Sequence, residues 1–410
     1  MAVGTVTNSV FEADLPTLAY DVEETPAEVY PRLQAAQRQA PLALGPFGPE
    51  VLSYRLVRSV LRDPRFQIPP GLNLLMQGIT SGPLWDKVVN SLLGMEGDTH
   101  HRVRSLASQA FTPRATLRLQ ETMVDVMHGL VDRIADEGRC DVVTDLARPF
   151  PVPVICALLG APREDWQQFS LWADDVFKAF TFTDGVREIE PVVMRAWTEL
   201  DSYVDDMVAR RRHSLTDDLL SDLIRAEDAG DRLSAAELRM MAGGLLLAGT
   251  DTTRNQLAAS VHVLCEHPEQ WMLLRERPEL AMHAVEETMR HSPIACGTLR
   301  QVVADAELGG YLIPAGTMVL VNTAAANRDP AVYDHPDRVD ITREGAPAIL
   351  TFGGGIHYCL GANLARRELA EALNVLVARL RNPRIVGPVP WKPMMGLSGP
   401  TSLPIEFDTA

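Results

Sequence analysis

A single cysteine, Cys359, has the sequence setting best suited to chemistry. It lies in the glycine-rich run FGGGIHYCLG at 352–361, and the next residues, ANLARRE at 362–368, are typical of the start of a helix. Backbone N–H groups and a helix N-terminus both favour the thiolate form of a nearby cysteine. A thiolate is a nucleophile or a metal ligand, so the surroundings of Cys359 must decide between these two roles.

A second unusual stretch follows the apolar residues 240–247 and reads AGTDTT at 248–253. Glycine in a helix interior costs up to ~1 kcal/mol relative to alanine, and Thr and Asp are weak helix formers. One explanation is a kinked, buried helix whose hydroxyls bond back to its own carbonyls. The other is a distorted groove that receives a small ligand, beside a hydroxyl and a carboxylate able to relay protons. These residues alone leave both explanations open.

Two charged pairs have helical spacing. Glu287 and Arg290 lie three residues apart, and His100 and Arg104 lie one turn apart, so each pair shares a helix face. Most pairs of this kind are solvated surface pairs that contribute little to stability. These pairs indicate a functional site only in combination with the cysteine loop.

The alternatives for Cys359 differ in how well they fit the chain. A papain-type nucleophile precedes its histidine in the sequence, which is the reverse of the order here. A zinc site needs a second cysteine two to four residues away, and none is present. A single thiolate suits a haem iron, with basic side chains such as Arg300 and His357 neutralising the carboxylates of the bound group.

The elements that must position these residues are mainly helical. We expect one domain over residues 1–410, with a loosely ordered segment at 1–20, because no linker, low-complexity tract or internal repeat divides the chain. The pattern predicts an irregular loop at 66–84, helices at 115–137, 217–227, 234–267, 279–291 and 364–380, and β-hairpins at 304–321. Ser234 and Glu237 form a capping-box signature at the start of the longest helix.

Composition excludes several classes of protein. The formal net charge of −16 argues against nucleic-acid binding. The N-terminus lacks the features of a signal peptide, and the apolar stretch 240–248 is too short to be a transmembrane anchor. Five widely spaced cysteines do not indicate a disulfide framework. We therefore expect a soluble, cytoplasmic protein.

From about Val51 to the C-terminus the chain resembles the cytochrome P-450 family of haem-thiolate monooxygenases, in its soluble bacterial form. The cysteine loop matches the family pattern Phe-Gly-x-Gly-x-His-x-Cys-x-Gly, AGTDTT at 248–253 matches the oxygen-activation motif, and Glu287 and Arg290 match Glu-x-x-Arg. Residues 336–340 resemble the stretch before the haem loop, although Val339 stands where Phe is commoner. The resemblance implies an α+β fold, mainly helical with small sheets, with haem between the oxygen-binding helix and the cysteine-loop helix.

The resemblance also implies roles at the cofactor. Cys359 would be the axial thiolate of haem b, and its electron donation would favour O–O cleavage. Phe352 and Gly353 would lie against the haem, and N–H groups around Leu360 and Gly361 would bond the sulfur. The two haem propionates would be bound by His100, Arg104, Arg300 and His357. The structural ion network below the haem would comprise Glu287, Arg290 and, as third member, Arg338.

For the reaction with O2, the resemblance implies a proton relay and an external electron supply. Thr252 would stabilise the oxygen species at the iron and order water, Asp251 would connect that water to solvent, and Gly249 or Ala248 would leave room for dioxygen. NAD(P)H-derived electrons would arrive from a ferredoxin or flavodoxin with its reductase, since 410 residues leave no room for a fused reductase. A basic docking face could include His101, Arg102, Arg366 and Arg367.

The predicted substrate pocket is apolar and has adaptable Met side chains, which favours a small, neutral, lipophilic substrate. Alternatives are a peroxide-driven hydroxylase and a non-catalytic haem-binding sensor, and an intact Asp251–Thr252 pair argues against both. The pocket is predicted to include Leu74, Met76, Trp85, Phe177, Phe182, Met241, Leu245, Ile294, Ala295, Met394 and Met395.

Overall fold

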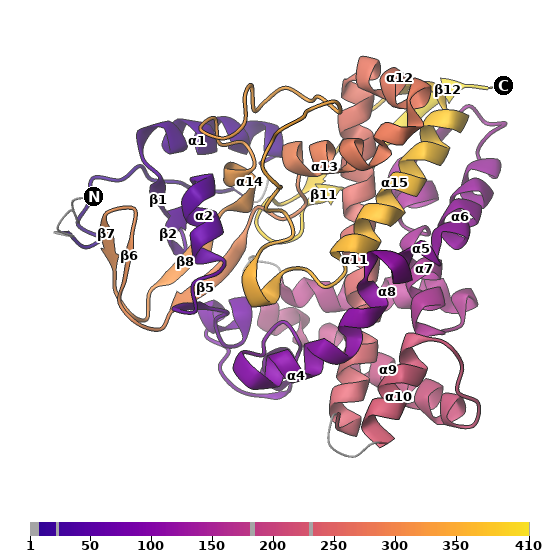
Figure 1. Cartoon of the computed structure of the whole chain (residues 1–410), viewed down its shortest axis with the longest axis horizontal. Helices are drawn as coiled ribbons and strands as arrows, with labels where there is room; N and C mark the ends of the chain where they lie inside the picture. The colour runs from indigo at the N-terminus through magenta and orange to yellow at the C-terminus, as the bar shows by residue number, and fades with distance from the viewer. Residues whose placement is uncertain (1–7, 22–23, 181–184, 229–232, 410) are drawn as a thin grey trace.

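The computed structural model describes residues 8–21, 24–180, 185–228 and 233–409. Most helices gather on one side of the molecule, and most strands lie on the other side with the N-terminal segment (Figure 1). The last strand is an exception, since it lies beside the helices near the C-terminus. This confirms the expected mainly helical α+β fold. The helices are α1 (Pro26–Gln39), α2 (Tyr54–Val60), α3 (Pro83–Val89), α4 (Gly97–Ser108), α5 (Pro113–Leu117), α6 (Gln120–Asp132), α7 (Pro151–Leu159), α8 (Trp166–Phe177), α9 (Val186–Arg212), α10 (Leu219–Asp228), α11 (Ala235–Glu266), α12 (Pro268–Glu276), α13 (Ala281–His291), α14 (Thr323–Ala326) and α15 (Ala362–Arg379).

Short strands form the sheets. One sheet has the order β1-β2-β8-β5-β3, and its neighbours are antiparallel except for the parallel pair β2–β8. The strands are β1 (Leu42–Gly45), β2 (Gly48–Val51), β3 (Phe66–Gln67), β4 (Arg139–Asp141), β5 (Thr298–Val302), β6 (Ala306–Leu308), β7 (Tyr311–Ile313), β8 (Met318–Val321), β9 (Arg381–Ile385), β10 (Trp391–Lys392), β11 (Gly399–Pro400) and β12 (Pro404–Asp408).

Helix α11 runs through the centre of the helical side. Its start is fixed as the sequence predicts: the Ser234 hydroxyl accepts from the Glu237 N–H at 3.2 Å, and the Glu237 carboxylate accepts from the Ser234 N–H at 2.8 Å. The helix packs against α7, α8, α9 and α15. Most of its residues are buried, and many of its apolar side chains belong to the largest hydrophobic cluster. Because neighbouring helices pack around α11 on several sides and fix its position, the helix can hold polar side chains at a defined place.

Part of the N-terminal segment packs beside the sheet. Within the described residues 8–20, Val10, Leu15 and Leu18 are buried, and Thr17 pairs with Leu44 of β1. These apolar side chains complete two hydrophobic clusters, which the expectation of a loosely ordered segment at 1–20 did not include.

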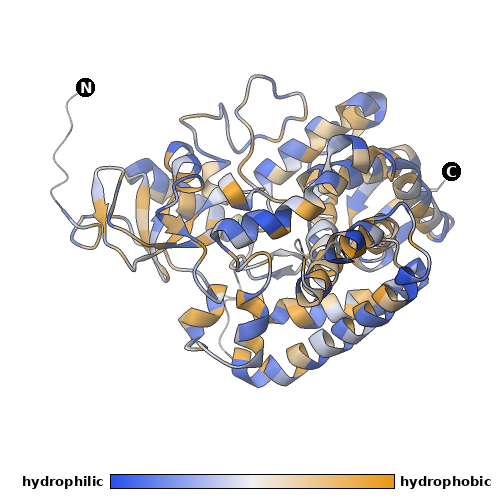
Figure 2. Ribbon diagram, turned by 60° about the horizontal axis from the view of Figure 1, so that its bottom comes forward, coloured by the Kyte–Doolittle hydropathy of each residue, from blue (hydrophilic) through white to orange (hydrophobic). Residues whose placement is uncertain are grey.

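Three further stretches differ from the sequence-based expectation. The helix predicted at 115–137 is divided into α5 and α6, and the loop predicted at 66–84 contains β3, a short 3-10 helix at Leu72–Gln77 and the start of α3. Within the described chain, Val142–Leu159 is apolar and long enough to cross a membrane, but 67% of it is buried inside the protein. Figure 2 shows hydrophobic and hydrophilic residues alternating along many helices, the pattern of elements that pack on one face.

Candidate active site

The cysteine loop is a rigid turn that places Cys359 just before α15. The Cys359 N–H donates to the Phe352 carbonyl at 2.9 Å and closes the loop. Gly355 has φ +65°, and a Cβ there would lie only 2.3 Å from the Leu61 carbonyl oxygen. Glycine is required at this position because both the backbone angle and the close approach exclude a side chain. The Cys359 side chain itself is exposed to accessible space.

The environment of the sulfur differs from the sequence-based expectation. Although Cys359 is exposed, the surrounding protein still removes much of the water from around its sulfur. This desolvation raises the pKa of the Cys359 thiol, and its effect exceeds the lowering by the Gly361 N–H hydrogen bond and by the charges of Arg104 and Arg366. The protein alone therefore does not favour the thiolate. A coordinated metal ion would, because it deprotonates the thiol that binds it.

Helix α11 presents an accessible strip in an otherwise buried helix. Gly244 and Ala248 are exposed and Thr252 is partly exposed, whereas the residues before each of them, Gly243, Leu247 and Asp251, are buried. Residues four apart lie on one helix face, so these three border the same space. The Thr252 hydroxyl donates to the Ala248 carbonyl at 2.7 Å. This is the back-bonded arrangement, and the helix continues through it without a break.

Gly249 lies against the neighbouring helix α7. A Cβ on Gly249 would lie 2.9 Å from Cγ1 of Ile155 in α7. The missing side chain therefore allows α7 to approach α11 closely. Of the two residues expected to leave room for dioxygen, Ala248 is exposed and Gly249 is partly exposed.

Asp251 is buried in a charged network that the sequence did not reveal. Its carboxylate pairs with Arg254 one turn further on, and Lys392 Nζ of β10 lies 3.8 Å from Asp251 Oδ1. Arg254 also pairs with Asp174 of α8. The side chain of Lys392 is 32% exposed, so this network extends from the interior to the surface. The spacing of Asp251 and Arg254 could have indicated their pair. Lys392 lies 141 positions beyond Asp251 in the sequence and gives no local signal of this contact.

Two histidines predicted at the cofactor lie together. The rings of His100 and His357 are 4.4 Å apart between centroids. His357 Nε2 lies 3.0 Å from Glu96 Oε1, a partner that the sequence analysis did not identify. His100 Nε2 is buried without a hydrogen-bond partner in the described part of the chain. Burial, His357 and Arg104 lower the pKa of His100 to about 4, so His100 is neutral at pH 7.

Arg300 and Arg104 are also available to an anionic group. Arg300 is buried, no carboxylate of the described residues pairs with it, and burial lowers its pKa to about 10. Its Nη1 donates to the Thr298 hydroxyl and the Leu299 carbonyl. Arg104 donates to the carbonyl of Tyr358 in the cysteine loop. A buried guanidinium with only neutral partners is costly, and an anionic ligand would offset that cost.

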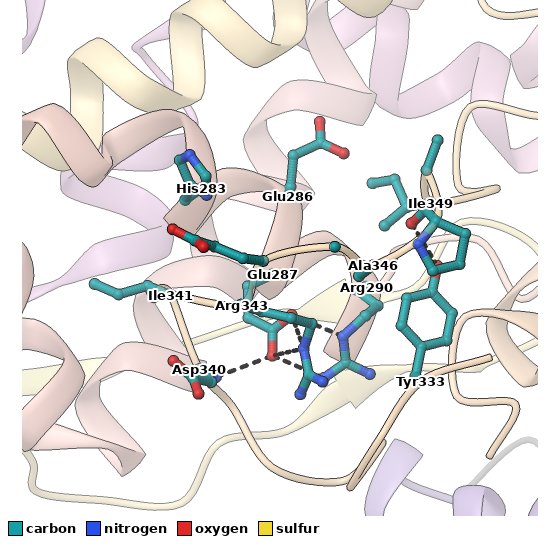
Figure 3. Close-up of a pocket in the computed structure, with 14 residues that line it drawn as sticks. His283, Glu286, Glu287, Arg290, Tyr333, Asp340, Ile341, Arg343, Ala346 and Ile349 are labelled. Atoms are coloured by element: carbon teal, nitrogen blue, oxygen red, sulfur yellow. Dashed lines mark hydrogen bonds and ion pairs between the residues drawn. The ribbon is translucent and has the colours of Figure 1, made fainter.

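The expected ion network is present with one different member. Arg290 holds the buried Glu287 carboxylate through Nε at 2.7 Å and Nη2 at 2.8 Å, and Arg343 Nε lies 3.2 Å from Glu287 Oε2 (Figure 3). The third arginine is therefore Arg343 and not Arg338. The side chain of Arg338 is 66% exposed and turns toward Asp340, and only its backbone carbonyl accepts from Arg290 and Arg343.

Part of the predicted substrate pocket is core. Leu74, Met241 and Met394 are packed into hydrophobic clusters, and Ile294 is buried. Their side chains fill space between elements and do not border accessible space. Phe182 lies outside the described residues. The remaining predicted residues are at least partly accessible: Met76, Trp85, Phe177, Leu245, Ala295 and Met395.

The predicted basic docking face carries acidic partners. Arg102 pairs with Glu237, Arg366 with Glu286 and Arg367 with Glu371, while His101 is exposed. The positive charge of these arginines is thus largely offset within the protein.

Comparison with known proteins identifies the family. The family model for Cytochrome P450 matches residues 89–382. The chain belongs to the cytochrome P450 family. It is 35% identical over 401 residues to luteothin monooxygenase of Streptomyces thioluteus, covering 97% of both chains. It is 40% identical over 371 residues to the mycinamicin IV hydroxylase/epoxidase of Micromonospora griseorubida, covering 88% of this chain and 91% of the relative.

A solved structure gives the same result. The crystal structure of CalO2 superimposes with a TM-score of 0.88 at 32% identity and covers 95% of this chain and 99% of its own. This cytochrome P450 is accordingly an oxidoreductase of the monooxygenase type, and its family carries haem with a cysteine thiolate ligand.

The residues present fit such a group. The described residues contain no cluster of three or more His, Cys, Asp or Glu side chains that could hold a metal ion. The unpartnered His100 Nε2 and the buried Arg300 are donors suited to propionates.

Proposed function

We propose that this cytochrome P450 inserts one oxygen atom of O2 into a C–H or C=C bond of a small lipophilic substrate, with Cys359 as the axial ligand of haem b. The observation that carries the proposal is the exposed Cys359 together with two buried groups suited to an anion: the unpartnered Nε2 of His100, and Arg300, whose hydrogen-bond partners are neutral. When bound, the haem iron supplies dioxygen activation, which electron donation from the thiolate favours. The mycinamicin relative is named both a hydroxylase and an epoxidase. These two activities correspond to oxygen insertion into a C–H bond and into a C=C bond.

The cofactor would be held by residues from three elements. Arg300 of β5 and His100 of α4 would donate hydrogen bonds to the propionates. Arg104 and His357 would also bind them, and His357 already contacts Glu96. Phe352 and Gly353 would border the group on the cysteine side, and Gly361 would keep its N–H hydrogen bond to the sulfur. That bond moderates how much charge the sulfur donates.

Protons would reach the reacting oxygen through α11. The Thr252 hydroxyl lies on the accessible strip and would donate a hydrogen bond there after leaving the Ala248 carbonyl. Asp251 would pass protons to it from solvent, and the partly exposed Lys392 supports such a route. Thr252→Ala should retain haem and substrate binding but divert electrons to peroxide, and wild-type coupling of NAD(P)H use to product in that variant would contradict the relay.

The electron donor is proposed to be a ferredoxin or flavodoxin with its reductase. Ile356 and Tyr358 of the cysteine loop are exposed, and they offer an apolar contact next to the sulfur. Because three of the expected docking arginines are paired internally, charge complementarity would contribute less than the sequence suggests. We also propose a cytoplasmic location, in which the five free cysteines remain reduced.

A reduced carbon-monoxide difference spectrum tests the ligand. We expect the strongly red-shifted Soret band of a thiolate-ligated haem, and an imidazole-type spectrum would overturn the assignment of Cys359. Product formation with O2 and electron donors, compared with peroxide alone, then separates the monooxygenase from a peroxide-driven hydroxylase. A haem-binding sensor would form product under neither condition.

A further inference from the structure

Arg366 of α15 connects three parts of the molecule beside the cysteine loop. Its guanidinium lies over the Phe352 ring, 4.4 Å from the ring centroid. Nη1 donates to the Tyr358 hydroxyl at 3.0 Å, and Nε pairs with the Glu286 carboxylate of α13. Stacking, hydrogen bond and ion pair together fix the planar guanidinium in one orientation.

This orientation turns the positive charge of Arg366 inward. The side chain is only 18% exposed, and Phe352, on which it stacks, accepts the hydrogen bond from the Cys359 N–H. Arg366 and Arg104 are the two cations whose charge acts on the Cys359 sulfur. A charge at a half-buried position is weakly screened, so its field at the sulfur is larger than that of a surface arginine.

Glu286 offsets this charge and has no part in the neighbouring ion network. In the pocket of about 340 Å³ beside α13, Figure 3 shows Glu286 directed away from Glu287 and Arg343, which bind each other. Glu286 instead forms an ion pair with Arg366. The two adjacent glutamates thus serve different purposes: Glu287 holds the fold, and Glu286 holds Arg366.

We propose that Arg366 and Glu286 are positioning residues that set the reduction potential of the thiolate-ligated group through the charge presented at Cys359. The proposal rests on the proposed function, because it requires Cys359 to be the ligand. Removing the cation of Arg366 disfavours the added electron, whereas removing the anion of Glu286 strengthens the cation and favours it. The two changes therefore shift the midpoint potential in opposite directions.

The chain offers a matched control in the next residue. Arg367 carries the same charge, lies on the same helix and pairs with Glu371 one turn further on. Arg367→Met changes the net charge as Arg366→Met does, but the contact that it removes is with Glu371 of the same helix and not with the cysteine loop. A difference between these two variants therefore reports the position of the charge and not its amount.

The test is a spectroelectrochemical titration of the purified holoprotein. We expect a lower midpoint potential for Arg366→Met, a higher one for Glu286→Gln, and a wild-type value for Arg367→Met. Arg366→Lys, which keeps the charge and loses the planar stack, should lie nearer to wild type than Arg366→Met. In the Glu286→Gln and Arg366→Met double variant, the effect of Glu286→Gln should largely vanish, because Glu286 acts through Arg366.

Failure of this inference is distinguishable from failure of the proposed function. Unshifted potentials, or shifts of the same sign, in variants that keep the thiolate-type carbon-monoxide spectrum would overturn the role of Arg366 alone. A wild-type protein without that spectrum would overturn the ligand assignment as well. If Arg366→Met does not retain haem, Glu286→Gln and Arg366→Lys still decide the sign of the effect.

Discussion

The two arginines Arg343 and Arg338 should differ sharply in their contribution to stability. Arg343 is 14% exposed and contacts the buried Glu287 carboxylate at 3.2 Å, and it donates to the carbonyls of Asp334 at 2.7 Å and Arg338 at 3.0 Å. Losing a partner of a buried ion costs about 3–5 kcal/mol. Because Arg290 still neutralises Glu287, we expect Arg343→Met to lower the free energy of unfolding by about 3 kcal/mol.

Arg338→Met is the matched control for that change. The Arg338 side chain is mostly solvent-exposed and lies 3.5 Å from Asp340, and surface pairs of this kind contribute about 0.2–1 kcal/mol. Its backbone carbonyl, which accepts from Arg290 and Arg343, is unchanged by the substitution.

The assay is urea unfolding of both holoprotein variants, followed by tryptophan fluorescence and by haem absorbance, with haem content measured after purification. We expect a lower unfolding midpoint and lower haem content for Arg343→Met only. Equal losses in the two variants, or a larger loss for Arg338→Met, would refute the assignment of Arg343 as the third member of the network.

Three other predictions follow from buried groups. Burial raises the pKa of Glu50 from 4.5 to about 7, so between these pH values the folded state keeps the proton that the unfolded state loses. The free energy of unfolding should therefore fall by at most about 3 kcal/mol as the pH rises from about 4.5 to 7. Urea unfolding at several pH values should show this slope in the wild type but not in Glu50→Gln, and an unchanged slope in the variant would contradict the prediction. Arg300→Met should weaken haem binding by about 2–3 kcal/mol, measured as faster transfer of haem to an excess acceptor protein, and His100→Leu should have the smaller effect because His100 is neutral. Lys392→Met should lower the fraction of NAD(P)H electrons that reach product and increase the solvent isotope effect on the reaction, whereas Lys392→Arg should stay near wild type. If the same fraction of electrons reaches product in both variants, Lys392 has no part in proton delivery.

The sequence predicted what depends on neighbouring residues. The glycine loop around Cys359, the Ser234–Glu237 cap and the Glu287–Arg290 pair depend on spacing within one element, and the structure contains each of them. The same reasoning overestimated how strongly the protein favours the Cys359 thiolate. Desolvation of the thiol, which raises its pKa, depends on the whole fold and not on neighbouring residues.

Contacts between distant segments could not be predicted. Arg338 and Arg343 both lie more than 50 positions beyond Glu287. Only the folded course of the chain decides which of the two side chains turns inward. Lys392 reaches Asp251 because β10 lies beside α11, which no local pattern indicates. Apolar residues such as Met241 have the composition of a pocket wall, but the neighbouring helices cover them.

The contact between Gly249 and Ile155 has a consequence for altering the substrate range by mutagenesis. Added volume at position 249 would collide with Cγ1 of Ile155 and force two core helices apart, so this position is closed to redesign. One residue earlier, Ala248 borders accessible space, and larger side chains there would reshape that space without disturbing the core. Along α11, tolerance to variation therefore alternates between adjacent residues, and libraries aimed at new selectivity should include Ala248 and leave Gly249 unchanged.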